Sequence, residues 1–173
     1  MIETERLLLR PYREEDLDEL FAMNSDVRIL KYLGNTPNTR AESWMRLLRN
    51  VGHWSLKGFG VFAIFEKETG RFVGNTGLAH HERGLGEQFD PFPEAGWVLA
   101  HWSHGKGYAS EAALAAHRWF DARGEARQTV CMIAPENSSS LRVAEKLGYR
   151  DFGRSEYKDA AVILFARTQG GSS

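Results

Sequence analysis

Apolar residues recur along the chain in two patterns that predict different elements. Helical spacing, with apolar positions three or four residues apart, occupies residues 14–24, 39–52, 108–124 and 135–148. Thr39 and Glu42 form a capping box at the start of the second stretch, and Gly52 is its expected end. Short apolar runs rich in β-formers predict strands at residues 6–10, 59–65, 71–79, 94–102, 129–134, 150–157 and 160–167.

The order of these elements predicts a mixed sheet in a single α/β (α+β) domain. Residues 59–79 read as an antiparallel hairpin, whereas the strand, helix and strand over 94–134 form the unit that makes two parallel neighbours. A chain of 173 residues with 42% hydrophobic residues suits one core. We expect one domain over residues 1–168 and a flexible tail over 169–173.

Composition removes several classes of function. A formal net charge of −1 excludes the bulk basic field of nucleic-acid binders, so a polyanion needs a local patch such as Lys106, Arg142 and Lys146. The single Cys131 excludes an internal disulfide framework and a cysteine zinc cluster. His80 and His81 would point to opposite faces of a strand, so no metal is expected. Without a signal-peptide core or an apolar run of about 18 residues, we expect a cytoplasmic protein that does not enter membranes.

A glycine turn at residues 103–107 opens directly into the third predicted helix. Unpaired N–H groups and partial positive charge at a helix start favour anions, and Gly105 and Gly107 let a ligand approach closely. An ordinary turn is the alternative. The P-loop motif fails because Gly107 follows Lys106, and the dinucleotide fingerprint fails because position 110 is serine.

Three stretches resemble one enzyme family. They are Thr4-Glu-Arg-Leu-Leu-Leu-Arg-Pro11, Gly107-Tyr-Ala-Ser-Glu-Ala112 and Glu136-Asn-Ser-Ser-Ser-Leu-Arg-Val-Ala-Glu-Lys-Leu-Gly-Tyr149. Together they are similar to the RimJ/RimL-type branch of the GNAT acetyltransferase superfamily, whose members acetylate protein N-termini or small amines. The family's Gln/Arg-x-x-Gly-x-Gly/Ala signature is met at Gly107 and Ala109, but His104 occupies its first position.

The resemblance implies a six- to seven-stranded, mostly antiparallel sheet with four helices, in which the fourth and fifth strands are parallel and splayed. Acetyl-CoA would lie between those strands, with its pyrophosphate on the amides of the glycine turn and its pantetheine arm on the backbone of the fourth strand. The residues expected to contact it are Val98, Leu99, Ala100, His104, Gly105, Lys106, Gly107, Tyr108, Ala109, Ser110, Asn137 and Arg142.

The implied reaction is attack of a neutral primary amine on the thioester, with no metal. Glu94 matches a carboxylate position and is a candidate base acting through water, or else a solvated strand-end residue. Asn137 is expected to bond the pantetheine or the acceptor, and its type also suits a helix N-cap. Ala144 replaces the tyrosine that many relatives place near the sulfur, so Ser140 is the nominated acid for the thiolate, with helix capping as its alternative.

The acceptor stays open between a protein N-terminal α-amine and a small-molecule amine. Glu87 and Asp90, together with Glu94, favour a cationic amine, and Tyr32 with Leu33 would form either one lip of its site or a plain connection. Phe89 and Phe92 are expected to be exposed and to serve the acceptor or a homodimer, since monomer and homodimer are both compatible. The alternative function is a non-catalytic module that binds an acyl-CoA as a sensor or scaffold.

Overall fold

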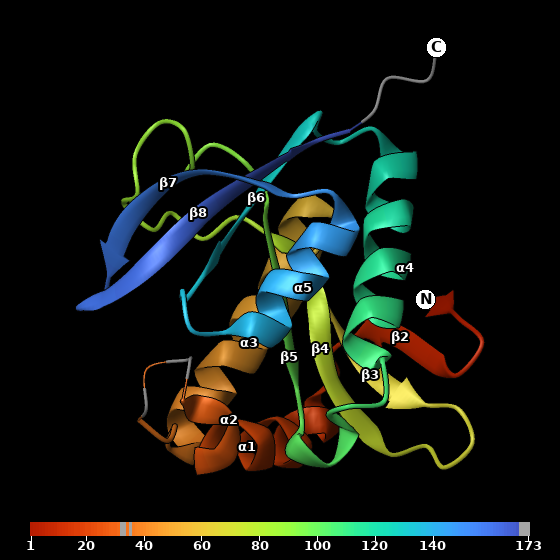
Figure 1. Cartoon of the computed structure of the whole chain (residues 1–173). Coiled ribbons are helices and arrows are strands. Elements are labelled where there is room, and N and C mark those ends of the chain that lie inside the picture. Colours follow the sequence, from red (N-terminus) through yellow and green to blue (C-terminus); the bar gives the residue numbers. More distant parts are fainter. Residues whose placement is uncertain (32–33, 35, 170–173) are drawn as a thin grey trace.

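The computed structural model describes residues 1–31, 34 and 36–169 as one eight-stranded sheet in the order β1-β2-β3-β4-β5-β6-β8-β7 (Figure 1). Neighbouring strands run antiparallel except β5 and β6, which confirms a mixed, mostly antiparallel sheet. The strands are β1 (Ile2–Glu3), β2 (Leu7–Pro11), β3 (Val61–Glu66), β4 (Phe72–Ala79), β5 (Glu94–Leu99), β6 (Gln128–Ile133), β7 (Arg150–Tyr157) and β8 (Ala160–Thr168). The expected count of six to seven was too low, because the two residues of β1 are too few to show a pattern.

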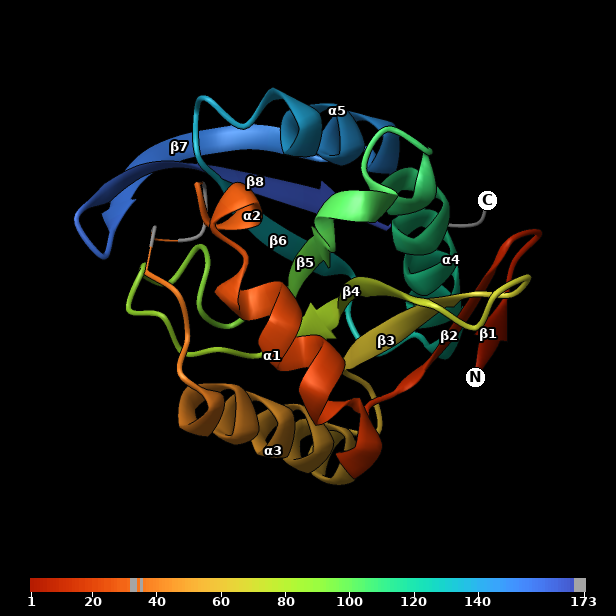
Figure 2. The same cartoon turned by 90° about the horizontal axis from the view of Figure 1, so that it is seen from below.

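Five α-helices flank the sheet instead of the four expected, because α2 is a single turn. They are α1 (Leu17–Ser25), α2 (Val27–Leu30), α3 (Arg40–Lys57), α4 (Tyr108–Arg123) and α5 (Ser138–Leu147). Figure 2 shows α1 and α3 on one face of the sheet and α4 and α5 on the other. No helix among the described residues is long and apolar enough to span a bilayer. The segment around Tyr32 and Leu33, expected at the acceptor site, lies outside the described residues.

The helix α3 extends beyond its predicted end. Its start is as predicted, since Thr39 Oγ1 accepts from Glu42 N and Glu42 caps Thr39 in return. Gly52 lies inside the helix, and the helix ends at Gly58, which adopts the left-handed conformation (φ 72°). A glycine within a helix costs only about 1 kcal/mol, which the packing of this 18-residue helix offsets. Composition alone could not distinguish the two glycines.

The strands β5 and β6 separate soon after they meet. Each pairs along its length with its other neighbour, β5 with β4 and β6 with β8. Between them the register contains the single pair Glu94 and Val130, with Val130 N donating to Pro93 O over 3.0 Å. Figure 1 shows β6 turning away from β5 beyond this point. The predicted splay is confirmed, and it leaves the outer backbone groups of β5 without a partner strand.

Candidate active site

The glycine turn leaves a row of amide donors without partners. Gly105 (φ 76°) and Gly107 (φ 79°) are both left-handed, a conformation that other residues adopt only with strain, and α4 begins at the next residue. The Gly107 cap position offers no side-chain hydrogen bond to the helix start. None of the amides from Gly105 to Ser110 donates to another described residue. A group of N–H donors at the positive end of a 16-residue helix suits an anion.

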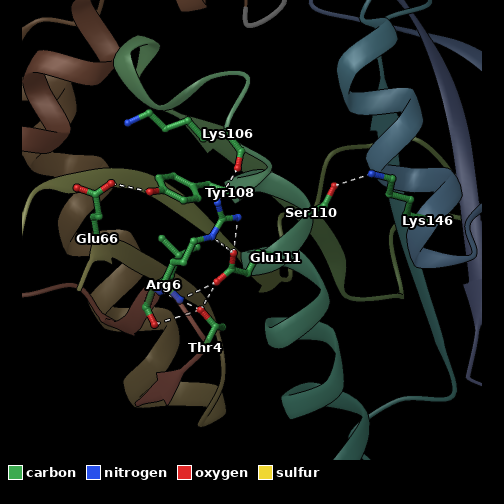
Figure 3. Close-up of polar contacts among 9 residues, drawn as sticks. Thr4, Arg6, Glu66, Lys106, Tyr108, Ser110, Glu111 and Lys146 are labelled. Atoms are coloured by element: carbon green, nitrogen blue, oxygen red, sulfur yellow. Dashed lines mark hydrogen bonds and ion pairs between the residues drawn. The ribbon is translucent and has the colours of Figure 1, made fainter. Parts of the chain in front are cut away.

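The first strand region anchors this turn. Glu111, in the first turn of α4, accepts hydrogen bonds from Thr4 Oγ1 (2.6 Å), Arg6 N (3.1 Å) and Arg6 Nε (2.8 Å). The same guanidinium donates through Nη1 to the carbonyl of Lys106 over 2.9 Å, as Figure 3 shows. Thr4 and Arg6 belong to one of the recognised sequence stretches and Glu111 to another. Their contact gives a physical reason for the residue types, although the sequence did not reveal that they meet.

Two lysines lie differently from the sequence expectation. The ammonium of Lys106, expected on the pyrophosphate, lies 4.5 Å above the Trp102 ring and points away from Ser110 (Figure 3). Lys146 of α5 instead places its Nζ 3.5 Å from Ser110 Oγ at the start of α4. Tyr108, between the two, donates its hydroxyl to Glu66. Lys146 is therefore the lysine nearest to the helix start in this network, and the expected contact of Lys106 stays a prediction.

A cavity of about 300 Å³ lies between β5, α5 and the glycine turn. Ten of its lining residues were among the expected acetyl-CoA contacts or catalytic residues: Val98, Leu99, His104, Gly105, Gly107, Tyr108, Ala109, Ser110, Asn137 and Ser140. The lining does not include Ala100, Lys106, Arg142 or Glu94. It adds residues that sequence reasoning missed: Arg28, Ile29, Trp97, Ser103, Ser139 and Val143. Arg28 and Ile29 come from the unpredicted helix α2.

Along β5, successive backbone amides point alternately toward β4 and toward the gap between β5 and β6. Ala100 N donates to Val73 O of the neighbouring chain segment, and in an antiparallel ladder alternate residues point to the same side. The amides of Val98 and Ala100 therefore face β4, so within the stretch 98–100, whose backbone was expected to pair with the pantetheine arm, the amide that faces the gap is that of Leu99. The amide of Trp97 faces the gap as well. The carbonyl of Leu99 accepts from His104 Nε2 over 2.9 Å, which turns that exposed imidazole toward β5.

Ser140 is placed as a hydrogen-bond donor toward the cavity. Its Oγ accepts from the indole Nε1 of Trp97 over 3.2 Å, and its own hydroxyl proton has no acceptor among the described residues. Asn137 caps α5 by accepting from Ser140 N over 3.1 Å, which confirms the capping alternative for Asn137. Ala144 is fully buried in the core that α4 and α5 share. Ser140 therefore remains available for chemistry.

Glu94 forms an ion pair on the other side of β5. Arg83 donates to both of its oxygens, through Nε at 2.6 Å and Nη2 at 2.9 Å, and donates to Tyr157 Oη at 3.0 Å. Burial raises the pKa of Glu94 above its ordinary value, while Arg83 acts in the opposite direction. Glu94 is 8% exposed, so it is not the solvated strand-end residue of the alternative expectation.

The loop before β5 does not present the features expected of it. Asp90 accepts hydrogen bonds from the amides of Leu85 and Gly86, so its carboxylate stabilises the loop. Phe89 is 2% exposed and packs on the β6 and β8 side chains, so the expectation that it would be exposed was wrong. Phe92 is partly buried in the same cluster. Asp90 and Glu94 are thus already engaged by protein groups, which weakens the basis for a cationic acceptor.

Known proteins are similar to this chain in sequence and in fold. The family description "Acetyltransferase (GNAT) domain" matches residues 6–150. The "Uncharacterized N-acetyltransferase p20" of Bacillus licheniformis is 30% identical over 94% of this chain and 93% of its own. A solved structure of a GnaT-family acetyltransferase from Bordetella pertussis is 32% identical, covers 96% of this chain and 98% of its own, and superposes with a TM-score of 0.87.

A structure with lower sequence identity contains coenzyme A. RimL, a ribosomal L7/L12 alpha-N-protein acetyltransferase solved in complex with coenzyme A, superposes with a TM-score of 0.75 over 95% of both chains at 18% identity. That likeness concerns the fold alone. The match over residues 6–150, and the relative that is 30% identical along nearly the whole chain, establish the family. The chain is a member of the GNAT acetyltransferase family.

Proposed function

We propose that this protein transfers the acetyl group of acetyl-CoA to a primary amine, of a protein N-terminus or of a small molecule, as RimJ/RimL-type enzymes do. The observation that carries the proposal is the cavity in which unpaired amides of the glycine turn, the free edge of β5 and the hydroxyl of Ser140 meet. A thioester carrier with a diphosphate at one end and a carbonyl at the other matches that order of groups.

The cavity offers a binding group for each part of acetyl-CoA. Amides from Gly105 to Ser110 would hold the pyrophosphate, with Lys146 and the exposed Arg142 of α5 as cations nearby. The gap-facing backbone groups of Trp97 and Leu99 would pair with the pantetheine arm in place of the missing strand. Val143 and Ile29 supply apolar walls. Asn137 would contribute its amide nitrogen, because its oxygen is used in the cap.

The chemistry proceeds by direct attack. The lone pair of a neutral amine forms the new C–N bond, and the tetrahedral oxyanion is stabilised by an amide of β5 that faces the gap. The C–S bond then breaks, and the thiolate of CoA takes a proton from Ser140, which is restored from water. At neutral pH about a tenth of an α-amine is already neutral, compared with under about 0.1% of a lysine amine. An α-amine therefore needs little help from a base.

Glu94 would act as the base only through water. Both of its oxygens accept from Arg83, so a bridging water must carry the amine proton to a remaining lone pair. The raised pKa of Glu94 makes it a better proton acceptor than an exposed carboxylate while it is still ionised. Its replacement by glutamine should lower the rate with lysine-like amines more than with α-amines. Equal losses with both amines would argue for a structural role of the ion pair.

The test of the proposal is release of free CoA thiol upon adding amines. Because the chain's single cysteine, Cys131, is fully buried, a disulfide reagent reports CoA with little background from the protein. Mass spectrometry of the amines identifies the acetylated acceptor. We expect thiol release equal to the acetylated amine formed. Acetyl-CoA binding by calorimetry without thiol release from any amine would instead support the non-catalytic acyl-CoA module.

A further inference from the structure

We propose that the acceptor amine also carries an anionic group, a carboxylate or a phosphate, bound by Arg46 and Arg49 of α3 beside Arg83. This inference rests on the proposed function, because it assigns the substrate class of the same site. It replaces the cationic acceptor expected from the sequence.

The face of β5 toward α1 and α3 is open at its centre. Side chains alternate along a strand, so Glu94, Gly96 and Val98 share one face, and Val98 packs in the cluster that contains α1 and α3 residues. Gly96 is exposed although its strand is central in the sheet. A Cβ built on Gly96 would meet no atom within 4 Å. An amine can therefore approach the β5–β6 gap past Gly96.

Hydrogen-bond donors without acceptors gather near this opening. Arg49 makes no hydrogen bond or ion pair with any described residue. Arg46, one helical turn earlier, makes one long hydrogen bond of 3.3 Å to Asn24 Oδ1. Asn24 is 3% exposed, and its Nδ2 is buried without a partner. Such a donor normally has an acceptor, so Asn24 Nδ2 is available to one that binds beside Arg46.

The charges near Glu94 do not balance. The guanidinium groups of Arg46, Arg49 and Arg83 lie close enough to repel one another, and together they lower the pKa of His81 further than burial alone does. The carboxylate that acts on these arginines is Glu94, which is paired with Arg83, while Asp90 acts on Glu94 and is itself bound to loop amides. Among the described residues, no carboxylate pairs with Arg46 or Arg49. Partial burial and then repulsion from Arg49 lower the pKa of Arg46, whereas Arg49 itself is exposed to solvent, so an anion bound between them would relieve repulsion mainly at Arg46.

Planar guanidinium groups match carboxylate and phosphate oxygens in geometry as well as charge. A cationic amine would meet repulsion from the same groups. The acceptor class that fits is therefore an amine with an acidic substituent, such as an amino acid, an acidic N-terminal peptide or an aminoalkyl phosphate. The neutral amine would enter past Gly96 while the acidic group stays on α3.

The experiment compares amines that differ only in charge. Glycylglycine is paired with glycylglycinamide, and aminoethyl phosphate with aminoethanol, using thiol release by the full chain at fixed ionic strength. We expect kcat/KM to be about tenfold or more higher for the anionic member of each pair. The double variant Arg46→Gln, Arg49→Gln should lose that preference, so that kcat/KM becomes equal for the two members of each pair. Arg118→Gln, an exposed arginine of α4, serves as the matched control.

A binding measurement decides the proposal even where no amine of the panel reacts. The CoA-saturated protein is titrated with sulfate, balanced by chloride, and its melting temperature is followed. Sulfate should stabilise the wild type and Arg118→Gln but not the double variant. Equal rates within both amine pairs, or no sulfate effect that depends on Arg46 and Arg49, would overturn the anionic acceptor while leaving acetyl transfer standing. Absence of both acetyl-CoA binding and thiol release would instead defeat the proposed function itself.

Discussion

The two faces of β5 differ in which polar groups have hydrogen-bond partners. On the α4 side, the charged side chains that anchor the glycine turn are paired: Glu111 accepts from Thr4 and Arg6, and Arg6 also donates to the Lys106 carbonyl. Within the described residues of that turn, the groups left without a partner are neutral backbone amides. On the α3 side, the groups without a partner among the described residues are side chains: the exposed guanidinium group of Arg49, the amide nitrogen of Asn24 and the hydroxyl of Ser43.

This difference indicates how the glycine turn would bind acetyl-CoA and how the α3 side would bind the acceptor. Paired charges around the glycine turn hold the backbone still, so its amides are positioned before a diphosphate arrives. The α3 side instead keeps a surplus of charge, which a ligand would neutralise. The first arrangement favours one constant cosubstrate, while the second discriminates among acceptors by their charge.

The largest effect should follow the loss of the left-handed turn. Gly107→Val forces a β-branched residue to φ 79°, a conformation that such residues adopt only with strain, so the turn must relax and its amides diverge. We expect the acetyl-CoA Kd measured by calorimetry to rise about 100-fold, or about 2.7 kcal/mol. Gly124→Val at the other end of α4 (φ 66°) carries similar strain and should leave the Kd unchanged. Similar affinity losses in both variants would point to unfolding instead.

Removing the hydroxyl of Ser140 should reduce turnover about 30-fold, or about 2 kcal/mol, because the thiolate loses its proton donor. The KM for acetyl-CoA should stay near the wild-type value. Ser139→Ala, which alters a neighbouring residue of the same cavity, is the control. Unchanged turnover in Ser140→Ala would remove this residue from the chemistry and leave water as the acid.

Neutralising the anchor of the turn should weaken acetyl-CoA binding about tenfold without changing the acceptor KM. In Glu111→Gln the carboxylate charge that holds Arg6 is lost. Glu125→Gln, which breaks the exposed pair with Arg123, is the control. If Glu111→Gln instead altered discrimination between acceptors, the separation of the two faces would be wrong.

The carboxylate of Glu111 should also make the stability of the fold depend on pH. Burial raises the pKa of Glu111, but hydrogen bonds from Thr4 and Arg6 outweigh burial and bring that pKa below its ordinary value of 4.5. A depressed folded-state pKa means that the anchor contributes fully above pH 4.5 and is lost as the pH falls through the lower folded value. The acid-induced loss of stability, measured by chemical denaturation, should therefore be shallower in Glu111→Gln than in the wild type. Identical slopes would contradict the assignment.

The smallest expected effect is a change in the pKa of His81, on the α3 side of β5. Burial, and next the charges of Arg83 and Arg49, lower the pKa of His81 to about 3. An anion on Arg49 should raise that pKa by about 0.5, since it offsets the repulsion. The imidazole resonances of His81, assigned with His81→Gln, would be titrated with and without sulfate in the CoA-saturated protein. Arg49→Gln should raise the pKa without sulfate and abolish the sulfate response.

The sequence predicted the elements that depend on local pattern. The capping box of Thr39, the hairpin of β3 and β4, and the glycine turn before α4 follow from periodicity and backbone preference. Ser140 and Asn137 followed from the resemblance, and the structure places both at the cavity. These features lie within short stretches, so neighbouring residues contain the information needed to infer them.

The features that were missed depend on contacts between distant segments. Arg6 meets Glu111 across 105 positions, and Trp97 meets Ser140 across 43. The surplus of arginines near Glu94 arises because α3 lies over β5, which no spacing in the sequence shows. The exposure of Phe89 was misjudged for the same reason, because the strands that bury it come later in the chain.

The most direct measurement is a two-dimensional nitrogen–proton NMR titration of the labelled protein with acetyl-CoA. We predict that the amides of Gly105, Gly107 and Ala109 and the indole N–H of Trp97 shift together with one Kd, while Arg49 on α3 does not respond. Shifts confined to α3, or an unmoved Trp97 indole with acetyl-CoA bound, would contradict a carrier whose acyl group lies between β5 and β6.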